Sequence, residues 1–295
     1  MAMVMTAAFD DYPQQLVRGV LGVLAPHGFT LVVSTFDPFH QAMPVSVAQL
    51  LRTTSPYGVI AAPSSSTQAE TDLAGLLDEL EIPVVRISAC SPGKTSIRSD
   101  DRIGMQALMG HLLDERGVRR LALARGIPHQ PDSVLREQVF REELAARGIP
   151  VDEELVFEGA FWHETTYREL RALLRRRRDV DAVVASNDLS ALGALAAVAD
   201  EGLRVPDDVL VTGFDNDASA LSWPDLTTVD PRLREQGAAA AERLLAEIDG
   251  VQPGGEILVP SRVLRHPAIR RGSPPPSTSR RRRRCSWPPG TRSGR

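Results

Sequence analysis

Two short polar segments follow buried strands in the second half of the chain, and they carry the residues best suited to bind a ligand. Residues 181–185 and 209–214 read as strands, with Asn187 and Asp215 just after them. In open α/β sheets, ligands bind at the carboxyl ends of the strands. An amide offers donors and an acceptor, and a carboxylate accepts from two hydroxyls, so the pair suits vicinal hydroxyl groups. The alternative is that both side chains cap a helix or a turn.

Three other residues have types and positions that suit binding. Arg136 falls at the start of an expected helix over residues 133–147, where the helix dipole disfavours a cation. Its planar fork could hold a hydroxyl pair or a carboxylate. Phe161 and Tyr12 each follow a strand and could stack on a sugar or a planar base. The alternatives are a solvated surface arginine and small hydrophobic plugs beneath the loops.

Motifs that carry catalysis are missing from the sequence. It has no Gly-rich phosphate loop, no GxGxxG fingerprint and no GxSxG elbow. The run 163–167 reads His-Glu-Thr-Thr-Tyr, with tyrosine where a zinc site needs its second histidine. We therefore expect no enzyme, no metal and no cofactor.

Expected strands and helices alternate along most of the chain. Such βαβ units build parallel sheets covered on both faces, and their number favours an α/β fold with two Rossmann-like lobes. We expect an N-terminal lobe over 1–124, to which 230–253 return. We expect a C-terminal lobe over 125–229, to which 254–269 return. The Arg/Pro/Ser-rich tail 270–295 should be disordered.

Charge is distributed unevenly between the main part of the chain and its tail. Residues 1–269 carry a net charge of −13, and the rest carry nine arginines and no acid. An acidic folded part repels nucleic-acid phosphates. There is no run of 18 apolar residues and no secretory leader, so we expect a cytoplasmic protein without membrane contact. Cys90 and Cys285 are too few for a disulfide framework or a metal site.

Five ordered motifs resemble the LacI/GalR family of transcription regulators. They lie at residues 99–117, 133–140, 186–193, 205–216 and 224–229. The whole match runs from about residue 4 to 266, although Asp101 stands where the family usually has asparagine. The resemblance implies the family's periplasmic-binding-protein-like type I fold, with a small-molecule effector held between the lobes.

The resemblance also implies a set of site residues and partners. Tyr12, Arg136, Phe161, Asn187 and Asp215 would bind the effector, a sugar or related metabolite. The family acts as homodimers whose N-terminal helix-turn-helix headpieces bind DNA. Here the first expected strand begins within a few residues of Met1. We therefore expect no headpiece and no operator binding by this chain alone. A solute-binding protein of a transport system, or a headless sensor of another signalling system, is the alternative.

Overall fold

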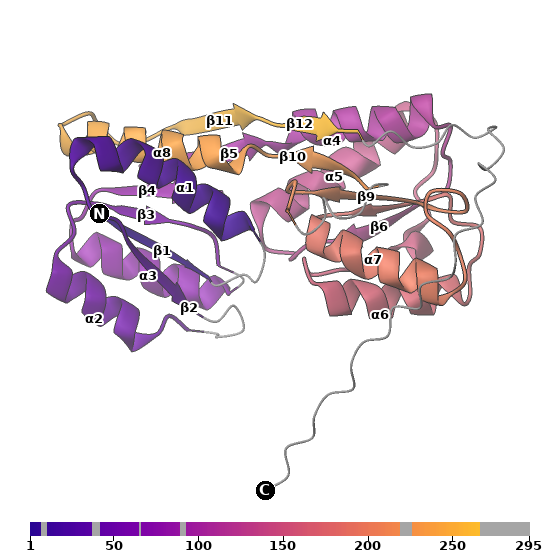
Figure 1. The fold of residues 1–295 in the computed structure, drawn as a ribbon, viewed down its shortest axis with the longest axis horizontal. Coiled ribbons are helices and arrows are strands. Elements are labelled where there is room, and N and C mark those ends of the chain that lie inside the picture. Colours follow the sequence, from indigo (N-terminus) through magenta and orange to yellow (C-terminus); the bar gives the residue numbers. More distant parts are fainter. Residues whose placement is uncertain (7–10, 37–41, 65, 89–92, 219–225, 266–295) are drawn as a thin grey trace, which may run out of the picture.

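The chain folds into two lobes that lie side by side, each built on one six-stranded sheet (Figure 1). The computed structural model describes residues 1–6, 11–36, 42–64, 66–88, 93–218 and 226–265. Cys90, Cys285 and the tail 270–295 lie outside these residues. None of the described helices is long and apolar enough to cross a membrane.

The first lobe has an all-parallel sheet with strand order β11-β5-β4-β3-β1-β2. Its strands are β1 (Ala2–Thr6), β2 (Val32–Phe36), β3 (Val59–Ala61), β4 (Val84–Ile87), β5 (Thr95–Asp100) and β11 (Glu256–Pro260). Its helices are α1 (Tyr12–Leu24), α2 (Val45–Thr54), α3 (Thr67–Glu79) and α8 (Leu233–Ile248). Ile60 packs with α1 and α8, whereas its neighbour Val59 packs with α2 and α3. This alternation buries both faces of the sheet, as parallel sheets require.

The second lobe repeats this arrangement, with strand order β12-β10-β9-β8-β6-β7. Its strands are β6 (Leu121–Arg125), β7 (Val156–Glu158), β8 (Ala182–Ala185), β9 (Leu210–Phe214), β10 (Thr227–Asp230) and β12 (Arg262–Leu264). Its helices are α4 (Asp101–Gly110), α5 (Pro131–Ala146), α6 (His163–Leu174) and α7 (Asp188–Asp200). Val184 packs with α4 and α5, and Val183 packs with α6 and α7. Only the edge pair β10 and β12 is antiparallel among the described strand pairs.

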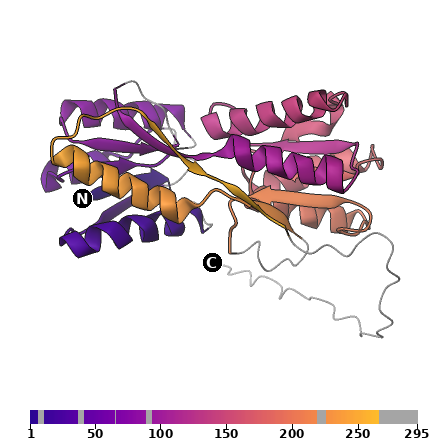
Figure 2. The same cartoon turned by 90° about the horizontal axis from the view of Figure 1, so that it is seen from above.

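The chain crosses between the lobes where β5 meets α4, where β10 leads to α8, and where β11 leads to β12. Figure 2 shows the last crossing as a pair of strands that runs diagonally from one lobe to the other. The hydroxyl of Ser261, in this crossing, donates to the backbone oxygen of Asp100 at 2.6 Å. Two of the crossings are therefore tied together by a hydrogen bond.

These crossings correct the lobe boundaries expected from the sequence. The first lobe ends at Asp100 and not at residue 124, because α4 and β6 pack in the core of the second lobe. Residues 254–269 do not return as a block to the second lobe, since β11 pairs with β5 and only β12 pairs with β10. The polar strand β5 was not expected at all. Its backbone is paired on both sides, and Ile97 anchors it in the core.

Helices α1 and α8 approach each other at two glycines. A Cβ on Gly19 would collide with the backbone oxygen of Arg234, and one on Gly237 would collide with the backbone of Leu16. Only glycine lets two helix backbones come this close. The contact fixes the start of α8 beside the middle of α1.

Candidate functional site

Arg136, on the second turn of α5, is buried between the elements of the second lobe, with 6% of its surface exposed. Its Nε pairs with Asp101 at 2.6 Å, and its Nη1 donates to the backbone oxygen of Ser186 at 2.6 Å. The guanidinium carbon lies 3.6 Å from the ring centroid of Phe214, which is cation–π distance. Arg136 is therefore not a solvated surface arginine. These contacts occupy Nε and Nη1 but not Nη2.

Charge around Arg136 is arranged to keep it ionised. Burial acts against its charge, but the carboxylates of Asp101, Asp215 and Asp132 outweigh burial and raise its pKa. Asp101 is fully buried at the start of α4, where the hydroxyl of Ser99 also donates to it. Asp101, which stands where the LacI/GalR family usually has asparagine, therefore neutralises the buried charge of Arg136.

Asn187 is the N-cap of α7, as the capping alternative anticipated. Its Oδ1 accepts from the backbone N–H of Ser190 at 2.9 Å, and its Nδ2 donates to the backbone oxygen of Phe161 at 3.3 Å. Phe161 is half-buried with a positive φ of 57°, and its ring lies where a Cβ on Gly126 would be. The same ring centroid is 5.8 Å from the guanidinium carbon of Arg136. Asn187 and Phe161 thus hold each other next to the arginine.

Tyr12 and Asp215 bring the two lobes together at this site. Asp215 follows β9, is 9% exposed, and its backbone N–H donates to Val229 at 2.8 Å. Tyr12 begins α1 in the first lobe. Burial raises the pKa of Tyr12 above its usual range, with further increases from Asp132 and Asp215 and opposition from a hydrogen bond with Ser88. Tyr12 therefore presents a neutral hydroxyl to the site.

Asp132 was not predicted from the sequence, and it has the clearest unmet hydrogen-bonding capacity in the site. Its Oδ1 is buried and has no hydrogen-bond partner among the described residues. Burial, and next the charge of Asp101, raise its pKa to about 6, while the charge of Arg136 and the nearby hydroxyl of Ser88 oppose the rise. An acid in the first turn of a helix is normally explained by its favourable interaction with the helix dipole. For this reason the sequence analysis did not single out Asp132 as a site residue.

Hydrogen bonds between the lobes flank these residues. The side-chain amide of Gln130, just before α5, donates to the backbone oxygen of Ser64 at 3.0 Å. The backbone N–H of Asp11, just before α1, donates to the carboxylate of Asp217 at 2.6 Å. Two hydrogen bonds therefore join the lobes next to Tyr12 and Asp132 along the chain.

We call the set Tyr12, Ser88, Asp132, Arg136, Phe161, Asn187 and Asp215 the interlobe site. The structure brings together all five residues expected from the sequence, through the contacts and charges above, and their binding of a ligand stays a prediction. The sequence analysis did not single out Ser88 or Asp132 as candidates for this site. Among the described residues, no group of three or more His, Cys, Asp or Glu side chains could hold a metal ion.

Comparison with known proteins supports the fold and its affiliation. Residues 110–273 match the periplasmic binding protein-like domain family. The chain is 35% identical over 189 residues to the HTH-type transcriptional regulator CelR of Thermobifida fusca, which covers 63% of this chain and 56% of that protein. It is 27% identical over 277 residues to the repressor CytR of Escherichia coli, covering 90% of this chain and 76% of CytR.

The solved structure of a transcriptional regulator CelR–cellobiose complex is also similar. It has a TM-score of 0.80 and 27% identity, and the match covers 90% of this chain and 83% of that one. The resemblance to the effector-binding core of LacI/GalR-type regulators is therefore confirmed. The present chain spans 56% of the length of T. fusca CelR. The family match at residues 110–273 covers more than half of the present chain. The chain therefore belongs to the periplasmic binding protein-like family.

Proposed function

We propose that this chain is the effector-sensing core of a LacI/GalR-type transcription regulator and binds a neutral, hydroxyl-rich small molecule at the interlobe site. The observation that carries the proposal is the buried, unpartnered Oδ1 of Asp132, opposite Tyr12 and Ser88. A buried acceptor without a donor is costly, and a ligand hydroxyl would satisfy it.

Charge at the interlobe site favours an uncharged ligand. Asp101, Asp132 and Asp215 surround the single guanidinium of Arg136. A phosphate or carboxylate ligand would add a negative charge to this excess, whereas sugar hydroxyls donate to carboxylates at no such cost. The ring of Phe161 offers a surface for the apolar face of a sugar. A sugar such as the cellobiose of the CelR complex is therefore the first candidate.

The relatives bear on how binding would be used. They are HTH-type transcription regulators, which favours this reading over a solute-binding protein of a transport system. We propose that the sensor core acts in a cytoplasmic homodimer and that an HTH headpiece, rather than the core, contacts DNA. The net charge of −13 on residues 1–269 argues against contact between the sensor core and the phosphates of DNA.

A screen of neutral mono- and disaccharides, including cellobiose, tests the proposal. A ligand at 100 times its Kd should stabilise the folded protein by about 2.7 kcal/mol, and this is measured as a rise in Tm. The hit is then titrated calorimetrically into wild type, Asp132→Asn and the control Asp207→Asn, an exposed aspartate of the second lobe. We expect at least a tenfold loss of affinity in Asp132→Asn alone. No hit across the panel, or equal affinity in the three proteins, would overturn the proposal.

A further inference from the structure

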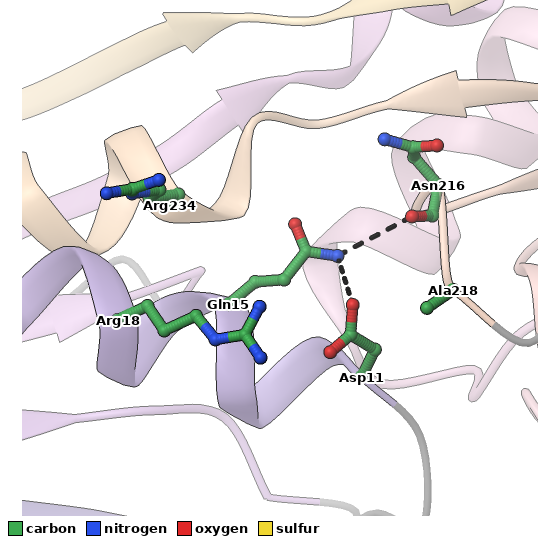
Figure 3. Close-up of a pocket in the computed structure, with 6 residues that line it drawn as sticks. All are labelled: Asp11, Gln15, Arg18, Asn216, Ala218 and Arg234. Carbon is green, nitrogen blue, oxygen red and sulfur yellow. Dashed lines mark hydrogen bonds between the residues drawn. The ribbon is translucent and has the colours of Figure 1, made fainter.

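A pocket lies beside the interlobe site, at the junction of α1, α8 and the segment after β9. It has a volume of about 280 Å³. Its lining residues are Asp11, Gln15, Arg18, Asn216, Ala218 and Arg234 (Figure 3). The first lobe supplies both arginines, and the second lobe supplies Asn216 and Ala218. The pocket is thus shared by the two lobes.

The two arginines of this pocket differ from most others in the chain. Most described arginines are held in ion pairs, such as those around Glu201. Neither Arg18 nor Arg234 forms an ion pair or a side-chain hydrogen bond within the described residues, and both are exposed. Two unneutralised guanidinium groups beside one pocket form a binding surface for an anion.

The fold itself holds the two arginines together. Arg18 precedes Gly19, and the missing Cβ of Gly19 is what allows the backbone oxygen of Arg234 to approach α1. The two arginines are therefore carried on helices whose backbones touch. Figure 3 shows both arginines on the side of Gln15 opposite to Asn216.

The remaining polar groups of the pocket leave room for an acceptor-rich ligand. The carboxylate of Asp11 accepts from the side-chain amide of Gln15 at 3.0 Å, and this amide also approaches the backbone oxygen of Asn216 at 3.5 Å. The Oδ1 of Asn216 is buried without a partner. The lining therefore holds two guanidinium groups and a single carboxylate, so its net charge is positive.

We infer that this pocket binds the phosphate group of a small molecule, either inorganic phosphate or the phosphoryl ester of a metabolite. Guanidinium groups bind phosphate oxygens in bidentate fashion, and a dianion relieves the repulsion between two of them. The inference goes beyond the proposed function, because the interlobe site disfavours anions. A bound phosphate would contact both lobes and so contribute to the arrangement in which they are found here.

The test uses the full chain and isothermal titration with inorganic phosphate, glucose 6-phosphate and glucose at low and physiological chloride. The variant Arg18→Gln/Arg234→Gln is compared with Arg116→Gln/Arg176→Gln, a matched pair of arginines that also lack ion pairs in the described structure. We expect phosphate binding by wild type and the control, weakened by added chloride because the site is exposed. We expect at least a tenfold loss in Arg18→Gln/Arg234→Gln.

Each outcome has a definite meaning. Binding of both phosphates identifies the phosphate group itself as the ligand, and binding of glucose 6-phosphate alone identifies an ester. Failure of wild type to bind either inorganic phosphate or glucose 6-phosphate, or equal binding in the two double variants, would overturn the inference. Neutral-sugar binding should be unchanged in Arg18→Gln/Arg234→Gln, which reports separately on the interlobe site and on folding. The phosphate titration can be read even if no neutral sugar binds.

Discussion

The two lobes share one architecture but contribute unequally to the interlobe site. The second lobe supplies Arg136, Asp132, Asn187, Phe161 and Asp215, most of them held by hydrogen bonds or ring contacts. The first lobe supplies only Tyr12 and Ser88. The second lobe thus presents a prepared surface of fixed side chains, to which the first lobe adds two hydroxyl groups.

This inequality has an energetic consequence. Side chains that are already fixed lose little entropy when a ligand binds, so their contacts convert more fully into affinity. We therefore expect changes in the second-lobe contacts to cost more than changes in the first lobe.

The largest effect should come from removing Asp101, the carboxylate that pairs with Arg136. Asp101→Ala leaves the buried guanidinium without its carboxylate, and breaking a buried ion pair in this way typically costs about 3–5 kcal/mol. We expect a loss of that size in the free energy of unfolding, measured with urea. The surface pair of Arg102 with Glu142 is the control, since Arg102→Gln should cost at most about 1 kcal/mol. Equal losses in the two variants would remove the argument for a prepared surface.

Next in size is the contribution of the Phe161 ring. If the ring stacks on the ligand, Phe161→Ala and Phe161→Leu should both weaken binding by about 1–3 kcal/mol. If Phe161 is only an apolar plug over Gly126, leucine should restore most of the affinity lost with alanine. Calorimetric titration of the neutral-sugar hit distinguishes the two roles. Circular dichroism checks that the positive-φ backbone tolerates both changes.

The sequence was sufficient to place the five predicted residues but not to describe what they do. Strand ends and helix starts can be read from hydrophobic patterns, and these positions converge in any parallel sheet. The roles depend on distant partners. The fork of Arg136 was expected to hold a hydroxyl pair or a carboxylate, and the sequence did not reveal that the carboxylate of Asp101, thirty-five positions earlier, occupies its Nε. Asp132 and β5 were missed because a first-turn acid and a polar strand have ordinary local explanations.

A smaller effect is expected from the first lobe. Tyr12→Phe removes one hydroxyl that donates or accepts a single neutral hydrogen bond, which is worth about 0.5–1.5 kcal/mol. The affinity for the neutral-sugar hit should fall by less than in either Phe161 variant. A loss larger than that of Phe161→Ala would reverse the comparison between the lobes and make Tyr12 the principal contact.

The pH dependence of stability sets the background for the last prediction. Burial raises the pKa of Asp132 to about 6 and that of Asp188 to about 7. Both folded-state values lie above those of the unfolded chain, so the protonated forms are favoured by folding. This contribution is complete below about pH 4, the unfolded value, and is lost as the pH rises through 6 and 7. The free energy of unfolding should therefore fall over that range.

Affinity should change with pH in the opposite direction. A ligand hydroxyl donates to the ionised form of Asp132, whose pKa is about 6, so protonation competes with binding. We expect constant affinity above that pH and a loss approaching tenfold per unit below it. Asp132→Asn should bind weakly at every pH, without this slope, while Asp188 keeps its own effect on stability. A slope that persists in Asp132→Asn would assign the titration to another group, and a wild type with no slope would show that the ligand does not donate to Asp132. Calorimetry between pH 5 and 8, paired with urea unfolding on the same samples, separates the two trends because they have opposite signs.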